Sequence, residues 1–566
     1  MTTKSEKKTL VITALGGLHE QGKNLFVLET SENEILILDA GVLYPGHDSP
    51  GVDYIFPEYQ YLINKVAQIK GLVLSSAHDY HCGGAHHLIS KCNIKKVIGS
   101  KLALSLVKAK LSPEFAETIE WTEFESRKEI QVSQFKVIPF SITSSNVESY
   151  ACYIEANGSK IFYSGNFKLD QTPTDGVKTD MVGITSVGSI AAETGEGIDL
   201  YIGDSLNAEK EGYTKSELEI YPKLKLMIES HKGRVIINTC NSNTVRIQNL
   251  FNIAKLCGRK IALLNRDARE IVKALNDSDC LDYEEENLVS IKDILNYNDK
   301  DLLILCTAPE GDAIRELEEI GFDRSLEIQL KEGDMVMNSA DLSPGTVRTM
   351  AKISDEFFLK EVKIVGGREA GIHADTHAAS EELKFMFNLV RPKHFIPGIG
   401  ETRQLIKHAQ LAVDSGFDPG SIFIIDNGDQ VELANKNLTI TGHIDTGNIL
   451  FNDSQDFHVD TKIVKERENL AKEGVVTVCF SISKKKKVVS GPVFSARACT
   501  FSNNKEWRAF CLMNSQDIID AIETLGEEKP RSNIDDYQNI VRDHMNNIIK
   551  NQIGKKPSVI VLASEV

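Results

Sequence analysis

The stretch "SSAHDYHCGG", residues 75–84, follows the apolar run "IKGLVL" at residues 69–74. It contains two histidines three positions apart, His78 and His81, and then a pair of glycines. A short apolar run bounded by turn residues predicts a buried strand. The two histidines are therefore expected on the turn that follows a strand.

A binuclear zinc hydrolase needs about three nitrogen or carboxylate ligands for each metal ion, with an open position for an activating water. One arrangement places the pattern HxHxDH on the turn after a strand and takes further ligands from later strand ends. Here the pattern reads Ser76-x-His78-x-Tyr80-His81. Two of its four expected ligands are present, so the stretch has the position of a metal site but half of its ligands.

The composition indicates an ordinary globular protein. Its 566 residues allow about two to four domains, and 41% are hydrophobic and 26% charged. No segment approaches the roughly 18 uncharged apolar residues of a membrane helix, and the first residues lack the apolar core of a signal peptide. The 10 cysteines occur singly, without a CxxC pair, which is typical of reduced thiols. We therefore expect a cytoplasmic protein that does not enter a membrane.

The net charge is 64 minus 81, or −17. Such a balance argues against broad non-specific binding to nucleic acid, but it leaves room for a local basic groove, because phosphate contacts depend on where the bases lie. For the run Lys484 to Lys487 we expect a solvated hairpin turn, with an RNA contact as the alternative. The scattered bases are expected on solvated helix faces, again with RNA as the alternative: Lys101, Lys108, Lys110, Arg246, Arg259 and Lys260.

Strand and helix patterns divide the chain into four regions and a linker. Residues 1–210 alternate short strands with turns, and residues 211–365 alternate strands with helices, which predicts a largely parallel sheet. Residues 366–440 are mixed, with a strand expected at "SIFIID". Residues 441–460 are polar and turn-rich, a predicted linker, and residues 461–566 read as β–β–β–α–α–β.

Five segments, in order along the chain, form a recognisable set. They are "ALGGLHEQGKN" (14–24), "LDAG" (38–41), "DSLNAEKEGYTKSE" (204–217), "HADTHAASEELK" (373–384) and "VSGPVFSARA" (489–498). In these segments the chain resembles the ribonuclease J family. The resemblance covers nearly the whole length and implies an α/β fold, in which a metallo-β-lactamase αββα sandwich carries an inserted β-CASP α/β domain and is followed by a small α+β C-terminal domain.

Carrying the family's metal ligands onto this sequence changes the expected chemistry. Of the seven ligand positions that the resemblance implies, His78 and His81 keep a ligand, and they would belong to different metals. Each metal would retain one protein ligand, far from the three that catalytic sites use. We therefore expect no cofactor, or zinc or manganese if the site still functions. The five altered positions are Ser76, Tyr80, Ser144, Asn166 and Ile399.

The histidines also allow a plainer interpretation. Without partners, His78 and His81 are expected to be surface or hydrogen-bonded side chains. His86 and His87 could in principle rebuild a site, but consecutive helical residues point about 100° apart, so only one could reach in. Asp39 is expected to be an acceptor that braces the loop of the motif.

The family's phosphate pocket uses an SGHA segment, which here is Asp375 to Ala378. Thr376 keeps a hydroxyl and His377 keeps an imidazole, so a phosphate or RNA contact could persist. Asp375 adds a carboxylate beside them, and Glu310 replaces a glutamine in a nearby loop. A carboxylate repels a phosphate unless a base lies close to it.

Three further polar residues of the family pattern are retained: Asp204, Ser205 and Asn207. The resemblance implies that RNA binds in a groove between the β-lactamase and β-CASP domains, so these three residues are candidates for phosphate or RNA binding together with Thr376 and His377. Without metals they have nothing to activate, so we expect them mainly to organise the domain junction.

The sequence thus predicts a catalytically inactive or weakly active ribonuclease J paralogue. It would be a non-catalytic subunit of a ribonuclease J complex in RNA processing and decay. The expected partners are an active ribonuclease J or a second copy of the chain, in a dimer or tetramer, and RNA. The alternative is an active metal-dependent 5′–3′ exonuclease and endonuclease, with a rearranged site, in mRNA decay and rRNA maturation. A third reading is a ligand-binding or sensory role on a recycled fold, since fold does not fix function.

Overall fold

The computed structural model describes the chain except for residues 1–7, 46–48, 195–196, 310–313, 341–344, 453–456 and 500–503, and the side chains of 189–194, 367–368 and 504. Two compact units are present. The first contains residues 54–449 and the chain up to residue 44, and the second contains residues 45–53 and 450–566. None of the described helices is long and apolar enough to cross a membrane.

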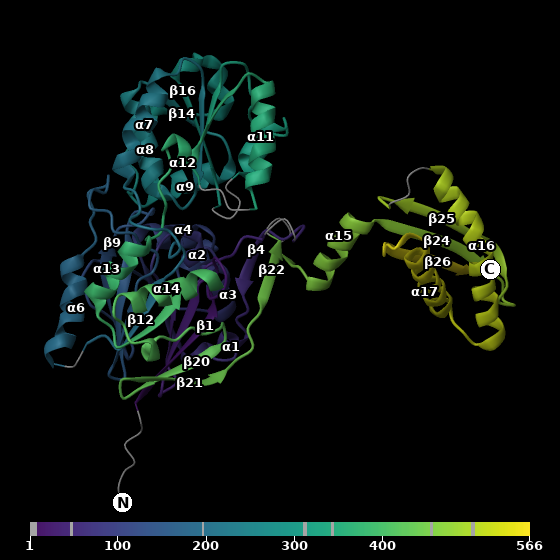
Figure 1. Cartoon of the computed structure of the whole chain (residues 1–566), viewed down its shortest axis with the longest axis horizontal. Coiled ribbons are helices and arrows are strands. Elements are labelled where there is room, and N and C mark those ends of the chain that lie inside the picture. Colours follow the sequence, from purple (N-terminus) through teal and green to yellow (C-terminus); the bar gives the residue numbers. More distant parts are fainter. Residues whose placement is uncertain are drawn as a thin grey trace, which may run out of the picture. The chain divides into compact units, whose positions relative to one another are not determined.

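Two β-sheets form the lower part of the first unit (Figure 1). The eight-stranded sheet has the order β21-β20-β1-β2-β3-β5-β6-β7, and the six-stranded sheet has the order β19-β12-β11-β10-β9-β8. The strands of the first sheet are β1 (Thr9–Gly16), β2 (Leu25–Thr30), β3 (Ile35–Leu38), β5 (Ile69–Leu74), β6 (Lys96–Gly99), β7 (Glu120–Glu123), β20 (Asp429–Ala434) and β21 (Asn437–His443). Those of the second are β8 (Ile130–Val132), β9 (Phe135–Ile142), β10 (Ser149–Ala156), β11 (Ser159–Tyr163), β12 (Leu200–Asp204) and β19 (His394–Gly398).

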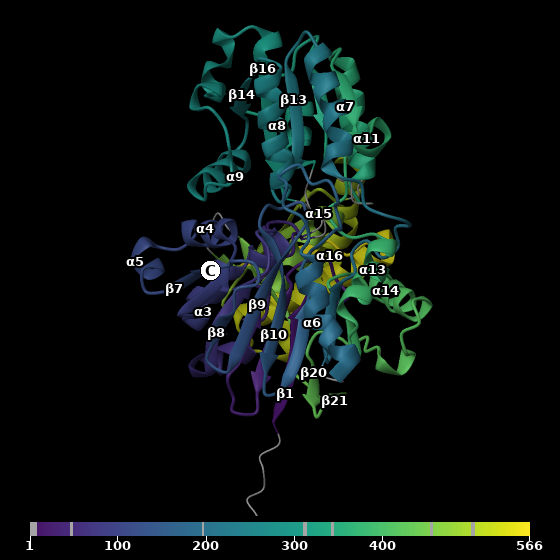
Figure 2. The same ribbon diagram turned by 90° about the vertical axis from the view of Figure 1, so that its left-hand side faces the viewer.

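The two sheets pack face to face, since one hydrophobic cluster contains buried side chains from both, among them Phe26 and Tyr163. A second cluster joins the outer face of the six-stranded sheet to α6 (Met181–Thr194), α13 (Ser380–Val390) and α14 (Thr402–Asp414). Beside the eight-stranded sheet, α4 (Lys101–Ala109) contacts β6 and β7, next to α3 (Ala85–Cys92) (Figure 2). This is the predicted αββα sandwich.

The insert forms a separate α/β layer above the sandwich (Figure 1). Its sheet has the order β15-β14-β16-β13-β17-β18, and every pairing is parallel, as the strand–helix alternation predicts. Helices α7 and α8 lie on one side and α11 on the other. The bounds are α7 (Glu217–Ser230), β13 (Val235–Cys240), α8 (Thr244–Leu256), β14 (Lys260–Leu263), α9 (Arg266–Asp277), β15 (Leu288–Val289), β16 (Leu302–Ala308), α10 (Arg315–Gly321), β17 (Met335–Asn338), α11 (Val347–Leu359), β18 (Lys363–Gly366) and α12 (Gly367–Ala370).

The second unit has a three-stranded sheet, β25-β24-β26, covered on one face by two long helices. Its elements are α15 (Thr461–Glu473), β24 (Val475–Ile482), β25 (Val488–Arg497), α16 (Asn504–Glu528), α17 (Ile534–Ile553) and β26 (Ser558–Glu565). The first element is a helix and not the predicted strand, because Asp460 caps a highly charged segment that buries only Val464. The run Lys484 to Lys487 lies in the turn between β24 and β25, as predicted.

Two other segments differ from the sequence pattern. "SIFIID" (421–426) is not a strand: Ile422 makes a single bridge to Phe395, and the chain then leaves the sheet. Within residues 441–460 the structure contains the end of β21 together with β22 (Asn448–Asn452) and β23 (Phe457–His458). The boundaries 1–210, 211–365 and 366–440 remain predictions.

Candidate functional site

The opening motif follows β5, as its sequence predicts. His78 is the N-cap of a single helical turn, α2 (Asp79–Cys82), where its Nδ1 accepts a hydrogen bond from the Tyr80 N–H at 3.2 Å. His78 and His81 are both fully buried, so neither is a surface residue. The turn therefore presents both histidines to the interior of the sandwich.

The buried carboxylate of Asp39 holds this turn. It accepts four hydrogen bonds: from the Ser75 N–H (2.8 Å), the Ser75 Oγ (2.9 Å), the Tyr163 hydroxyl (2.5 Å) and His81 Nδ1 (2.7 Å). These four donors satisfy the buried carboxylate with groups of the protein itself. Asp39 is thus the structural acceptor that the sequence predicts, and we call it, with Ser75, His81 and Tyr163, the Asp39 hub.

Within the hub, His81 has the orientation that metal-bound histidines usually have. Its Nδ1 donates to a carboxylate, and in metal sites this arrangement leaves Nε2 to face the metal. Here Nε2 lies 3.4 Å from the side-chain nitrogen of Asn24. The scaffold that would orient one ligand is therefore preserved.

Two of the altered positions, Ser76 and Ser144, meet at a third hydroxyl. The Oγ of Ser149 lies 2.9 Å from the Oγ of Ser144 and 3.4 Å from that of Ser76, and it donates to the carbonyl of Asn146. All three serines are buried. A chain of neutral hydroxyls thus occupies the place where the resemblance implies two imidazoles.

The other three altered positions are also buried. Tyr80 belongs to the hydrophobic core, with its ring centroid 4.8 Å from that of His78. Both amide atoms of Asn166 lack a hydrogen-bond partner. Ile399 is in the left-handed region, at φ 53°, which is strained for a β-branched residue, and its carbonyl accepts from the Ser205 N–H.

These residues do not fit a two-metal centre. Among the described residues, no group of three or more His, Cys, Asp or Glu side chains is placed to hold a metal ion. Ile399 offers no ligand atom, and Asn166 offers no charge to hold two cations near each other. His87 is engaged elsewhere, with its Nδ1 2.9 Å from the Tyr59 hydroxyl and its ring stacked on Phe56. Burial lowers the pKa of the neighbouring His86 to about 3.

A second buried pair survives at the end of β12. His377 Nδ1 lies 2.6 Å from Asp204 Oδ2, while Oδ1 of the same carboxylate accepts from the Leu206 N–H. The side chain of Asn207 donates to the His377 carbonyl. Ser205 donates to the Gly398 carbonyl. These contacts tie three distant segments of the chain together.

His377 lines a cleft of about 880 Å³ in the first unit. One wall comes from residues 206–210 and 373–377. The opposite wall comes from the carboxyl ends of β13 and β17 and from α11. The carboxyl ends of parallel strands are common ligand sites in α/β sheets. Thr376 also lines the cleft, so the structure brings both residues of the predicted phosphate pocket to it.

The charges in this cleft are largely compensated. Lys210 Nζ lies 2.9 Å from Asp375 Oδ1, and Arg403 Nε lies 2.9 Å from Glu209 Oε2. Glu369 also lines the cleft. The described lining therefore carries more carboxylates than bases. Glu310, the other predicted change, lies outside the described residues.

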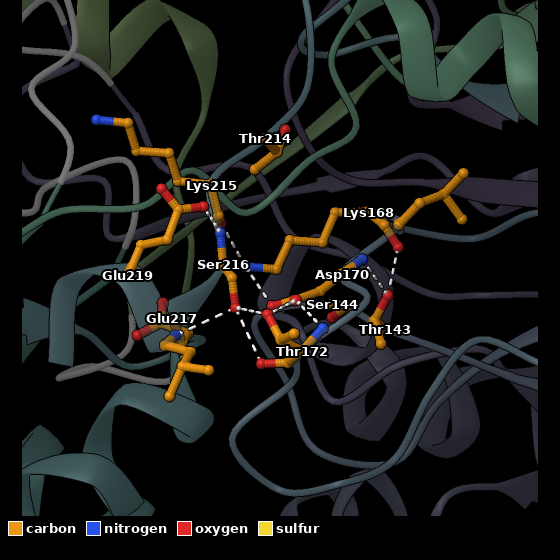
Figure 3. Close-up of polar contacts among 12 residues, drawn as sticks. Thr143, Ser144, Lys168, Asp170, Thr172, Thr214, Lys215, Ser216, Glu217 and Glu219 are labelled. Carbon is orange, nitrogen blue, oxygen red and sulfur yellow. Dashed lines mark hydrogen bonds and ion pairs between the residues drawn. The ribbon is translucent and has the colours of Figure 1, made fainter.

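A hydrogen-bond network braces the point where the chain enters the insert (Figure 3). Thr143 Oγ donates to the Lys168 carbonyl, and the Asp170 N–H donates to the same hydroxyl. The Thr172 N–H donates to Asp170, and the Ser216 hydroxyl donates to the Thr172 carbonyl. Ser216 also caps α7, so the network couples the "SGNFK" segment to the first helix of the insert.

Two arginines that the sequence suggested for solvated faces are buried. Arg246 binds the Glu217 carboxylate with two parallel hydrogen bonds, of 2.6 and 2.7 Å. Burial alone would raise the pKa of Glu217, but the charge and hydrogen bonds of Arg246 outweigh it and lower that pKa. Arg259 donates to four backbone carbonyls. The capping box of Ser216 and Glu219 is a local signal that a helix begins at Glu217, but it does not indicate that Glu217 binds Arg246.

Together, the αββα sandwich, its α/β insert and the motif after β5 define a metallo-β-lactamase fold with a β-CASP domain. Residues 232–357 match the model of the ribonuclease J β-CASP domain, and residues 462–566 match that of the ribonuclease J C-terminal domain. The first match falls within the region 211–365 of strand–helix alternation, and the second falls within residues 461–566.

The chain belongs to the ribonuclease J family. It is 31% identical to Ribonuclease J of Synechocystis over 501 residues, and this alignment covers 88% of this chain and 77% of the relative. Ribonuclease J2 of Bacillus subtilis is 28% identical over 565 residues, 100% of both chains. Ribonuclease J of Helicobacter pylori is 29% identical over 487 residues, 86% of this chain and 70% of the relative.

Proposed function

We propose that this chain is a catalytically inactive or weakly active ribonuclease J paralogue, a non-catalytic subunit in RNA processing and decay. One observation carries the proposal. At all five altered positions, from Ser76 to Ile399, the side chain is buried and brings no carboxylate or imidazole to a metal. Ile399 offers no ligand atom at all. Hydrolysis by this family's route needs a metal-activated water, and nothing in the described residues replaces it.

The remaining features support a role in holding RNA. The Asp204–His377 pair and the cleft beside it are present, although five of the seven metal ligands that the resemblance implies are replaced. A cleft kept between the sandwich and the insert fits a single strand that is positioned but not cut. The rival, an active enzyme with a rearranged site, would need ligands that the described residues do not bring together.

The second unit supports a role in assembly with an active ribonuclease J or a second copy of the chain. In β24, alternate residues such as Val476 and Val478 pack against the helices, and Cys479 faces the other way. On that open face, Val493 of β25 pairs with Cys479, and Leu562 of β26 lies on its other side. Val493 is 64% exposed and Leu562 is 55% exposed. Among the described residues of the second unit no layer covers this apolar sheet face, and such a face is typical of an interaction surface.

Metal content and nuclease activity test the proposal first. We expect the purified protein to contain less than about 0.1 zinc or manganese per chain, against about two for an intact two-metal site. We also expect no metal-dependent cleavage of single-stranded RNA, that is, no cleavage that is lost when EDTA is added. Elemental mass spectrometry and a gel assay measure both, with an intact ribonuclease J as the control. Two metals per chain with metal-dependent cleavage would refute the non-catalytic role.

Assembly is tested by co-expression with the intact ribonuclease J of the same genome. We expect a mixed complex in size-exclusion chromatography with light scattering, and at least a tenfold weaker association for Val493→Glu, because burying an unpaired charge is costly. Leu512→Glu, which alters another exposed apolar residue, on α16, is the control. If the two variants behave alike, the open sheet face is not the interface.

A further inference from the structure

A cavity of about 620 Å³ lies at the edge of the insert sheet, where β15 is the outermost strand. Its apolar lining comes from Leu263 at the end of β14, from Leu288 and Val289 of β15, and from Ile291 in the short helix that follows. Leu263 and Ile291 are buried, and the two residues of β15 are half-buried. A cavity of this volume, largely apolar with a few polar groups, is the usual form of a small-molecule site.

Arg269 of α9 brings a fixed positive charge to this cavity. Its Nη1 donates to the carbonyls of Leu263 (3.3 Å) and Leu264 (3.0 Å), so the backbone holds the guanidinium in place. Its Nη2 lies 3.6 Å from Glu327 Oε1, which is beyond hydrogen-bond distance, and both side chains are partly exposed. The pairing with Glu327 is therefore weak, and the guanidinium can bind a second anion.

Lys292 supplies a second base to the lining. Its backbone N–H donates to the Ser290 hydroxyl at 3.3 Å, and its side chain is exposed. In the described part of the chain, its ammonium group has no hydrogen-bond or ion-pair partner. The lining thus has two bases against one acid, Glu327, in a chain whose net charge is −17. An uncompensated ammonium beside an apolar cavity favours a ligand with a negative charge at one end.

From this combination we propose that the cavity binds a small organic carboxylate with an apolar body. The body packs against Leu288, Val289 and Ile291, and the carboxylate faces Arg269 and Lys292. Arg269 gives the carboxylate a fixed donor, and Lys292 gives it an uncompensated charge. The cavity shares no described lining residue with the cleft beside His377, and ligand binding here requires neither RNA nor metal.

Three compounds with the same body test the preference for a carboxylate: 4-phenylbutyrate, 4-phenylbutan-1-ol and 4-phenylbutylamine. Binding to the full-length protein is measured by isothermal titration calorimetry. We expect the carboxylate to bind about fivefold more tightly than the alcohol, the gain from one ion pair in water, and the amine to bind most weakly. Equal affinity for all three, or no binding of 4-phenylbutyrate at millimolar concentration, would overturn the proposal.

Variants of the lining locate the site. Lys292→Gln should lower the affinity for 4-phenylbutyrate about fivefold and leave that for the alcohol nearly unchanged, because it removes charge and keeps the apolar lining. Lys300→Gln, which alters an exposed lysine of the same domain outside the lining, should change neither affinity. Leu288→Glu should abolish binding of both compounds, because it places a charge in the apolar part of the cavity.

Thermal unfolding shows whether each variant is folded. If Leu288→Glu does not fold, Lys292→Gln alone decides, since its side chain is exposed and its removal should not affect folding. If 4-phenylbutyrate binds to Lys292→Gln as tightly as to the unaltered protein, its carboxylate does not lie beside Lys292, and the proposed site is wrong.

Discussion

Arg246→Ala is expected to lower the free energy of unfolding of the first unit by about 3–5 kcal/mol, because it leaves a buried carboxylate without its partner. Arg246 is fully buried. Its guanidinium binds Glu217 through two hydrogen bonds, and its Nη1 also donates to the Ser339 carbonyl at 2.8 Å. The side chain thus joins α7, α8 and the end of β17, and alanine breaks all these contacts at once.

Denaturant unfolding followed by circular dichroism measures this effect. The matched control is Arg403→Ala, which removes an exposed pair with Glu209 and should cost at most about 1 kcal/mol. The double variant Arg246→Met, Glu217→Leu should be less destabilised than Arg246→Ala, because it leaves no buried charge behind. A loss in Arg246→Ala no larger than that of the control would show that the pair contributes little.

Restoring the five altered positions together is expected to convert the chain into a metal-binding protein with about two zinc or manganese ions. His78 and His81 are already in place, and the Asp39 hub already holds His81 in a metal-compatible orientation. The combined variant carries Ser76→His, Tyr80→Asp, Ser144→His, Asn166→Asp and Ile399→His. Elemental mass spectrometry and the RNA cleavage assay measure the gain.

The matched control restores four positions and keeps Tyr80. Its ring lies in the hydrophobic core beside His78, where the resemblance places a carboxylate, so this variant should bind metal much more weakly. Thermal unfolding of each variant separates failure to fold from failure to bind. If the five-position variant folds but binds no metal, the site has lost other features in addition to its ligands.

Much of the fold could be predicted from local patterns. The run "LLILCTA" is β16 from its first residue to its last, and "SEELKFMFNLV" is α13. Apolar spacing identifies such elements, because apolar residues recur along a helix or strand with the period that places them on its buried face. The alternation of strands and helices likewise predicted the parallel sheet of the insert.

The side chains of the site were less predictable, because their partners are distant in sequence. Nothing near Arg246 shows that Glu217, 29 positions earlier, pairs with it. Nor does the sequence show that Ser149 joins Ser76 to Ser144, since that contact depends on β10 lying next to the motif turn. The segment "SIFIID" has a strand pattern but makes only one bridge, because strand formation needs a neighbour along its whole length.

The Asp39 hub has a consequence for the conditions in which this chain folds. Four hydrogen bonds to one buried carboxylate anchor the motif turn to β5 and β11, and all four donors belong to the protein itself. Proteins whose loops are tied by bound ions lose structure when the ions are withdrawn. This turn is held by hydrogen bonds from serine, tyrosine and histidine, so the chain should stay folded when zinc and manganese are withheld. A cell short of zinc or manganese would then still contain this chain in its folded form.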